Sequence, residues 1–157
     1  MTGARPRRDY VVDASVAIKL FVPEPLAEQA EAVFATLTAR PASRLHVPDL
    51  FFSECANILW KYVWRSGYPA EDARQDIVDL LTLAVRSVST ATLVAEALEI
   101  ALTQRVTVYD ACSVALAAQL QAPLLTADEA LLRKLRPTSY WVEWLGNFPV
   151  TPHPPAT

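Results

Sequence analysis

The chain alternates short apolar runs with longer segments in which apolar residues recur every three or four positions. The short runs have the length and composition of buried strands, and they predict strands at residues 10–12, 45–47, 86–89, 124–126 and 140–145. Residues 107–109 are expected to be an extended segment. The periodic segments have one apolar face, as amphipathic helices do. They predict a helix from residue 16 to the prolines at 23 and 25 and further helices at residues 26–39, 49–65, 70–85, 92–104, 111–120 and 128–135. This alternation predicts an α/β fold with three layers, α/β/α, around a mainly parallel central sheet.

The length of 157 residues fits a single domain. We place this domain at residues 10–148, between a basic, flexible arm at residues 1–9 and a proline-rich, disordered tail at residues 149–157. No signal-peptide pattern is visible, and the longest uncharged run, residues 111–127, is interrupted by polar residues and a proline. We therefore expect a soluble, cytoplasmic protein without a membrane span.

Composition narrows the possible function classes. Apolar residues make up 52% of the chain and charged residues 20%, which is typical of a globular protein. The 14 Lys and Arg residues, against 17 Asp and Glu residues, exclude a strongly basic protein that coats nucleic acid. They leave open a nuclease that contacts phosphate mainly through metal ions.

Glycine, histidine and cysteine are too scarce for several common sites. The three glycines, Gly3, Gly67 and Gly146, lie too far apart for a phosphate-binding glycine loop or a nucleophile elbow. A histidine-based triad or metal site would depend on His46, since the other histidine lies in the tail. The two cysteines lie within apolar helical patterns without Cys-x-x-Cys spacing, which predicts buried thiols in a reducing compartment.

Four acidic residues differ from the rest, most of which lie on polar helix faces. Asp13 directly follows the first predicted strand and Asp128 closely follows the fourth, where parallel α/β sheets hold their ligands. Asp110 precedes the uncharged helix at residues 111–120, and Glu54 lies at the border of the apolar stripe of its helix. Each acid alone also has a structural interpretation. Asp110 and Asp128 fit helix N-caps, Asp13 fits a turn residue and Glu54 fits a boundary position.

Four carboxylates gathered at one place repel one another unless cations balance them. Only Lys19 and Lys61 lie near them in the sequence. Divalent Mg²⁺ or Mn²⁺ is the better source of positive charge, because these ions prefer carboxylate oxygen. A bound divalent ion activates water and stabilises negative charge that develops on phosphate. The sequence therefore predicts hydrolysis of phosphodiester bonds with Mg²⁺ or Mn²⁺ as cofactor.

Four short motifs, each containing one of these acids, occur in order between residues 10 and 146. They are Val11-Val12-Asp13-Ala14-Ser15, Glu54 in a helix after Pro48, Tyr109-Asp110-Ala111 followed by Val114-Ala115-Leu116-Ala117, and Leu124-Leu125-Thr126-Ala127-Asp128. With these motifs the chain resembles the PIN-domain ribonucleases, especially the VapC-type toxins of toxin–antitoxin pairs. The resemblance implies a sheet in strand order 3-2-1-4-5, Mg²⁺- or Mn²⁺-dependent cleavage of RNA, a homodimer and a small antitoxin protein as partner.

The resemblance also implies a role for each of the catalytic acids. Asp13 and Asp110 would be the primary metal ligands, while Glu54 and Asp128 would complete the acidic metal site directly or through water. The main alternative is a catalytically idle PIN-like module that binds RNA or protein without cutting. The presence of all four acids favours an active enzyme.

Four further residues, in or near these motifs, affect the geometry of the motifs. Ser15 and Thr126 would orient the acids by the resemblance, and they also fit a helix cap and a strand-end polar residue. Gln104 and Gln121 precede the third and fourth motifs, where relatives often carry glycine. We expect either glutamine to force its helix end out of the left-handed conformation, at a cost of about 1 kcal/mol.

Two other classes that gather acids at strand ends fit the sequence less well. A phosphate-accepting receiver domain needs a lysine after a late strand, and residues 124–128 contain none. A phosphatase with an aspartyl nucleophile needs a second Asp two residues after the first, where this chain has Ser15.

Trp60 and Trp64 lie i, i+4 apart on the helix that contains Glu54, on the side away from its apolar stripe. Two interpretations stay open for this pair. One is an exposed protein interface, either a dimer seam or a groove for an antitoxin. The other is burial under a neighbouring helix.

Overall fold

The central element of the computed structural model, which describes residues 8–39 and 41–151, is a sheet of five strands. The strands are β1 (Asp9–Val12), β2 (Arg44–Pro48), β3 (Arg86–Val88), β4 (Leu124–Thr126) and β5 (Val142–Trp144). Every neighbouring pair is parallel, and the order is β3-β2-β1-β4-β5. This confirms the predicted fold class and strand order, and it makes β1 and β4 neighbours at the centre.

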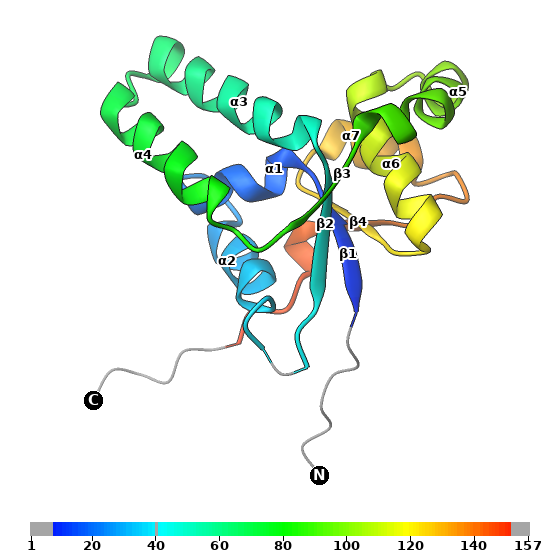
Figure 1. Cartoon of the computed structure of the whole chain (residues 1–157), viewed down its shortest axis with the longest axis horizontal. Coiled ribbons are helices and arrows are strands. Elements are labelled where there is room, and N and C mark those ends of the chain that lie inside the picture. The colour runs from blue at the N-terminus through cyan, green and yellow to red at the C-terminus, as the bar shows by residue number, and fades with distance from the viewer. Residues whose placement is uncertain (1–7, 40, 152–157) are drawn as a thin grey trace.

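Seven α-helices and three short 3₁₀ helices connect the strands within the described ranges. The α-helices are α1 (Ala14–Ala17), α2 (Ala27–Ala35), α3 (Leu50–Ser66), α4 (Ala70–Leu81), α5 (Val94–Gln104), α6 (Val108–Leu120) and α7 (Glu129–Leu135). The 3₁₀ helices are η1 (Ile18–Leu20), η2 (Thr90–Thr92) and η3 (Leu145–Asn147). In Figure 1 the α3–α4 pair and the α5–α6 pair rise on two sides of the strand ends.

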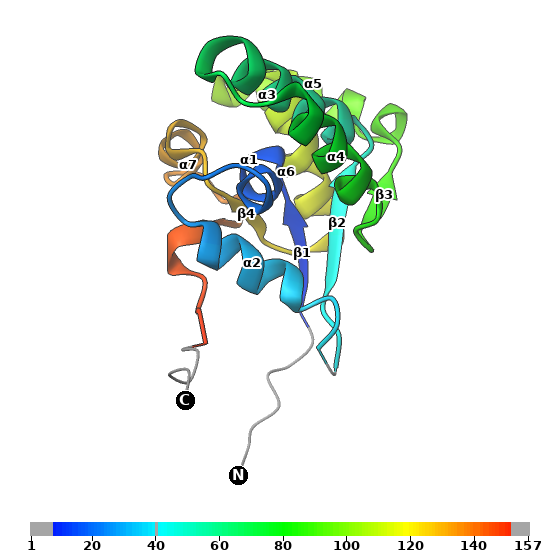
Figure 2. The same cartoon turned by 90° about the vertical axis from the view of Figure 1, so that its left-hand side faces the viewer.

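Helices cover both faces of the sheet because successive strand residues point to opposite sides. Val11 and Leu124 pack in one core with α5, α6 and α7. Val12 and Leu125 pack in a second core with α1, α2 and α3. Figure 2 shows α2 in front of β1 and α6 behind it. The strand pattern thus produces three layers with a core on each side of the sheet.

The helix α6 lies directly against the sheet and is buried on several sides, as its uncharged composition predicts. Residues 111–117 are all buried, and α5 packs along the outer side of α6. Small side chains allow this close approach, because four of those seven residues are alanine or serine. The burial fixes the start of α6, and therefore Asp110, relative to the strands.

Two predicted helices end four residues earlier than expected, α2 at Ala35 and α4 at Leu81. In each case the hydroxyl of the next residue, Thr36 or Thr82, donates to a carbonyl oxygen three residues earlier at 2.6 Å. In a continuing helix this carbonyl oxygen would accept a backbone N–H instead, so the hydroxyl competes with the helix for it. The apolar periodicity extends past these residues and does not reveal this competition.

The helix ends before the third and fourth acidic motifs are left-handed without glycine. Gln121 follows α6 with φ 51°, so the expectation that it forces this helix end out of the left-handed conformation is wrong. After α5 the left-handed residue is Arg105, with φ 56°, and Gln104 is the last helical residue. Non-glycine residues adopt this conformation at a cost of about 1 kcal/mol, which packing of the flanking helices offsets.

The predicted arm and tail fall mainly on residues 1–7 and 152–157, which lie outside the described residues. Asp9 is already part of β1, and Arg8 forms an ion pair with Glu143, with Nη2 and Oε1 3.1 Å apart. Within residues 8–39 and 41–151, no helix is both long enough and apolar enough to cross a membrane.

Candidate active site

The four acids singled out in the sequence lie around the carboxyl ends of β1 and β4. Asp13 directly follows β1 and Asp128 lies two residues after β4, while Glu54 and Asp110 come from α3 and α6. Their charges act on one another. Negative charge on Asp110 and Asp128 raises the pKa of Asp13, and charge on Asp13 and Asp110 raises the pKa of Glu54. The fold therefore places the four carboxylates close enough to interact.

Asp13 is held by hydroxyl groups on both of its carboxylate oxygens. Oγ of Ser15 donates to Oδ1, and Oγ1 of the fully buried Thr126 donates to Oδ2. Oδ1 also accepts the backbone N–H of Val16 at 3.3 Å, so Asp13 is the N-cap of α1. These contacts fix the direction of the Asp13 carboxylate relative to β4.

The same two hydroxyls join the loop after β1 to the loop after β4. Oγ of Ser15 accepts the N–H of Ala127 at 2.9 Å, and Oγ1 of Thr126 accepts the N–H of Asp128 at 3.0 Å. Asp128 then caps α7, because its Oδ1 accepts two N–H groups of the first turn at 2.9 and 3.0 Å. The N-cap interpretation is confirmed for Asp128, whose Oδ2 has no hydrogen-bond partner among the described residues.

Asp110 lies inside the first turn of α6 rather than before the helix. The N-cap is Thr107, whose Oγ1 accepts the N–H of Asp110 at 3.1 Å. The prediction of an extended segment at residues 107–109 is therefore wrong, and so is the N-cap interpretation of Asp110. The Thr-x-x-Asp spacing is a helix-start signal that identifies this cap. The hydroxyl of Thr107 also acts on the Asp110 carboxylate, whose pKa it lowers.

Burial and mutual repulsion make the carboxyl groups of Asp13, Glu54 and Asp110 unusually weak acids. Burial raises the pKa of Asp13 to about 6, even though its two hydroxyl donors lower it. Burial also raises the pKa of Glu54 to about 7. The pKa of Asp110 rises because of burial and, to a smaller extent, because of the charge on Asp128. The ionised site therefore holds negative charge that the protein neutralises only in part.

The basic residues near the acids in the sequence do not supply the balancing charge. Lys19 forms an ion pair with Glu24 at 2.9 Å, and the hydroxyl of Tyr62 also donates to Glu24. The cation that acts on the site is Lys134 of α7, whose charge lowers the pKa of Asp110. Sequence reasoning missed Lys134 because its approach depends on how α7 packs against the loop after α5. No local signal distinguishes it from the adjacent Arg133.

The donor set fits a hard divalent cation that keeps part of its water shell. No group of three His, Cys, Asp or Glu side chains within residues 8–39 and 41–151 is arranged to enclose a metal ion by itself. Mg²⁺ is commonly bound by one or two carboxylates, with water and substrate phosphate as the other ligands. His46 contacts Asp9 at 3.4 Å and not the acidic site. Oxygen donors without histidine are the set that Mg²⁺ or Mn²⁺ prefers.

Trp60 and Trp64 are 55% and 74% exposed, so burial under a neighbouring helix is the wrong interpretation. Both border an apolar groove of about 500 Å³ between α3 and α4. Leu59 and Ile77 also line this groove, which we call the α3–α4 groove. It presents apolar and aromatic side chains to solvent on an element that also carries Glu54.

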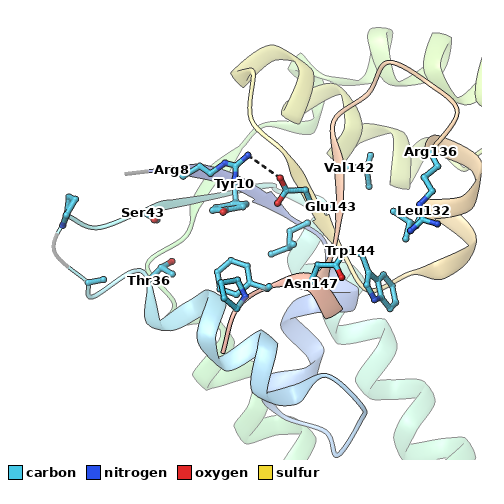
Figure 3. Close-up of a pocket in the computed structure, with 15 residues that line it drawn as sticks. Arg8, Tyr10, Thr36, Ser43, Leu132, Arg136, Val142, Glu143, Trp144 and Asn147 are labelled. Atoms are coloured by element: carbon cyan, nitrogen blue, oxygen red, sulfur yellow. Dashed lines mark hydrogen bonds and ion pairs between the residues drawn. The ribbon is translucent and has the colours of Figure 1, made fainter. Parts of the chain in front are cut away.

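A larger cavity, of about 760 Å³, lies beside β5 and does not contain the four acids (Figure 3). Arg8 and Glu143 in its wall form the ion pair drawn in Figure 3. The guanidinium of Arg8 also lies over the rings of Trp141 and Tyr10, with its carbon 4.6 and 5.5 Å from the ring centres. Opposite charges here neutralise each other, unlike those of the acidic site.

The fold, the four motifs and the acidic site together define a family. The sequence profile of the PIN domain matches residues 10–136, and the chain belongs to the PIN-domain family. The chain is also 40% identical over 127 residues to ribonuclease VapC3 of Pyrobaculum aerophilum, a match that covers 79% of this chain and 92% of that protein. The resemblance to VapC-type proteins is confirmed.

Solved structures share the fold at lower sequence identity. PAE2754 of Pyrobaculum aerophilum is 24% identical, with a TM-score of 0.65 over 89% of this chain and 92% of that chain. VapBC2 of Rickettsia felis, bound to a DNA fragment from its promoter, has a chain that is 10% identical, with a TM-score of 0.57. That match covers 87% of this chain and 98% of the other. At these identities the similarity shows a common fold.

Proposed function

We propose that this protein is a divalent-metal-dependent endoribonuclease and the toxin of a toxin–antitoxin pair. The observation that carries the proposal is the group of four interacting carboxylates at the carboxyl ends of β1 and β4. Membership of the PIN-domain family and the 40% identity to a ribonuclease VapC support it. A toxin that acts on RNA works in the cytoplasm, where the two buried, unpaired cysteines also stay reduced.

Each residue of the site has a distinct task in this proposal. Asp13 and Asp110 would hold Mg²⁺ or Mn²⁺, and Glu54 and Asp128 would complete the site directly or through water. Held there, the cation would supply stabilisation of the negative charge that develops on the phosphodiester and would make water a better nucleophile. Without a bound cation the pKa of Glu54 is about 7, so this carboxyl group is partly protonated near neutral pH in the metal-free protein.

Ser15 and Thr126 act as positioning residues for Asp13. Their hydroxyls donate to its two carboxylate oxygens, which keeps both oxygens turned in one direction when no cation is bound. Backbone N–H groups of the loop after β4 in turn donate to these hydroxyls. This arrangement couples the position of Asp13 to that of Asp128.

Cleavage of RNA by the purified full-length chain tests the proposal. With Mg²⁺ or Mn²⁺ present we expect internal cleavage of a long single-stranded RNA, and EDTA should abolish it until excess metal is restored. Undiminished cleavage in EDTA would contradict the metal mechanism. RNA binding without cleavage in either metal would favour the catalytically idle alternative.

We further propose that the α3–α4 groove binds an apolar helix of the antitoxin. A groove between two helices accepts such a segment through spaced apolar side chains, and exposed tryptophans are frequent anchors of protein interfaces. The VapBC complex among the structures that share this fold supports an antitoxin partner. A homodimer through the same pair of tryptophans is the competing use of this surface.

The double variant Trp60→Ala and Trp64→Ala separates these uses. We expect weaker binding to the small protein encoded beside this chain, with unchanged mass in light scattering and unchanged Mn²⁺ affinity. Leu102→Ala is a matched control, because Leu102 is 67% exposed on α5, outside the α3–α4 groove. A halved mass would assign the tryptophans to the dimer seam, and no change in either measurement would exclude both uses.

A further inference from the structure

A hollow of about 290 Å³ adjoins the acidic site on the side of α7. Asp110 and Asp128 line it together with Arg105 and Lys134, and Val106, Thr107, Ala130 and Leu131 complete the wall. We call it the Arg105–Lys134 hollow. At about 30 Å³ for each water, it has room for about ten waters, which is enough for a phosphate group with its ribose.

The two cations of this hollow are held by the backbone around them. Nζ of Lys134 donates to the carbonyl oxygen of Arg105 at 2.7 Å, which joins the end of α7 to the turn after α5. Arg105 itself occupies the left-handed position that ends α5. An ammonium group has three N–H donors, so the contact with Arg105 leaves donors of Lys134 for an anion.

Neither cation is neutralised by a close acidic partner. Within the described part of the chain, Arg105 and Lys134 form no ion pair, whereas Arg8, Lys19 and Arg74 each do. The charge of Lys134 reaches Asp110, whose pKa it lowers, without an ion pair between them. The hollow therefore has an acidic side that continues the proposed metal site and a basic side that faces the same space.

We propose that the Arg105–Lys134 hollow binds the phosphate of the nucleotide adjacent to the one being cleaved in a single-stranded RNA. The inference rests on the proposed ribonuclease function. A phosphodiester at the four acids is necessarily followed along the strand by another phosphate, which must lie against a neighbouring surface. Two cations next to the acids supply that surface, and Lys or Arg contacts with phosphate position a strand without reading its sequence.

An acidic segment of a protein partner is the competing ligand for the same two cations. RNA is the better fit because the acidic wall formed by Asp110 and Asp128 repels a peptide carboxylate that brings no metal with it. In a substrate, by contrast, the neighbouring phosphate is attached to the phosphodiester that the proposed metal site holds. The geometry thus favours a nucleic acid strand that spans both sides of the hollow.

Binding of labelled oligouridylate, measured by fluorescence anisotropy over a range of salt concentrations, tests this proposal. The measurements use the full-length Glu54→Gln chain in Mg²⁺, which keeps Asp13 and Asp110, the two acids proposed to hold the metal, and in which cleavage is expected to be slow. Lys134→Gln and Arg105→Gln should each weaken binding about fivefold at 0.1 M salt and lower the slope of log K against log salt by about 0.7. Arg133→Gln is the matched control, because Arg133 is exposed on the same turn of α7 and does not line the hollow.

Equal losses for Arg133→Gln and Lys134→Gln would overturn the proposal, as would unchanged binding in the two hollow variants. A loss of affinity for a polyglutamate peptide, without a loss for oligouridylate, would assign the hollow to a protein ligand.

Lys134→Arg keeps the charge and should restore binding. Arg105→Gln keeps the backbone carbonyl that Lys134 contacts, so it remains informative if Lys134→Gln unfolds. Wild-type cleavage in Mn²⁺ is measured separately, so failure of the ribonuclease function is distinguished from failure of this subsite.

Discussion

The acidic site and the cavity beside β5 both contain charged side chains, but the two regions balance charge differently. In the cavity, Glu143 lies 3.1 Å from Arg8, whose guanidinium also stacks on aromatic rings. At the acidic site, Asp13 and Glu54 are half-buried near other acids, and burial and these charges raise their pKa values to about 6 and about 7. The acid in the wall of the larger cavity therefore has a cationic partner at ion-pair distance, while the acids of the acidic site have none among the described residues.

This difference in charge pairing indicates which of the two regions is the candidate active site. Half-buried carboxylates that repel one another destabilise a fold, and the divalent cation that we propose at this site would relieve the repulsion. A paired charge at a partly exposed position needs no such cation and contributes little to stability. Charge balance, and not cavity volume, therefore distinguishes the candidate active site in this protein.

The two regions should differ most in RNA cleavage when one acid of each is replaced. Asp13→Asn should lower the rate of RNA cleavage by about 10³-fold or more, because it removes a charge proposed to bind the metal. Glu143→Gln should leave cleavage unchanged, since Glu143 contacts Arg8 and Trp141 and none of the four acids. Rates measured on the same RNA with saturating Mn²⁺ check both. A comparable loss in Glu143→Gln would break the distinction between the two regions.

The metal-free protein should become more stable as the pH falls from about 8 to about 4.5. The folded chain binds protons at Glu54 and Asp13 with pKa values of about 7 and about 6, whereas their ordinary values are 4.5 and 3.8. Where the folded state holds more protons than the unfolded state, unfolding free energy increases with acidity. Over this pH range Asp13 alone accounts for an increase on the order of 2 kcal/mol.

Urea unfolding in EDTA at several pH values measures this trend. Glu54→Gln should flatten the upper part of the profile, near pH 7, and Glu143→Gln should not. If the wild-type protein becomes steadily less stable as the pH falls over the same range, the acids do not repel one another in the folded state.

Removing the hydroxyl of Thr126 should weaken metal binding without removing any charge. Thr126→Val deletes the donor to Oδ2 of Asp13 and the acceptor for the N–H of Asp128. Loss of a residue that orients a metal ligand typically lowers metal affinity 10- to 100-fold. Mn²⁺ titration calorimetry measures the change, and Thr126→Ser, which keeps the hydroxyl, should retain affinity. Equal affinities for the Val and Ser variants would exclude a positioning role.

The smallest effects concern the helix ends that lead into the acidic site. Gln121 is left-handed, so Gln121→Gly should raise the unfolding free energy by about 0.5–1 kcal/mol. Gln104 is helical, so Gln104→Gly should lower it by a similar amount, about 0.5–1 kcal/mol. Thermal or urea unfolding distinguishes the signs. A stabilising Gln104→Gly would contradict the assignment of the left-handed position to Arg105.

Much of the fold was predictable from the sequence, because the strands are short apolar runs and the helices between them are segments with one apolar face. The segment at residues 107–109 was misassigned because Thr, Val and Tyr all favour strands. The cap that Thr107 provides overrides this local preference and starts α6 at Val108. The ends of α2 and α4 likewise depend on threonine hydroxyls that periodicity does not register.

The acidic site was predictable to the extent that it depends on position along the strands. Asp13 and Asp128 follow neighbouring parallel strands, so their meeting is a consequence of topology. The contribution of Lys134 was not predictable, because it requires the end of α7 to pack beside the turn at Arg105. The exposure of Trp60 and Trp64 also depended on where α4 lies relative to α3.

Mn²⁺ binding to the metal-free protein shows whether the acidic site holds a divalent cation. Calorimetry should show saturable Mn²⁺ binding to the wild type near neutral pH, strong weakening in Asp13→Asn and Asp110→Asn, and wild-type affinity in Glu143→Gln. Absence of binding to the wild type, or the same affinity in all four proteins, would contradict the account.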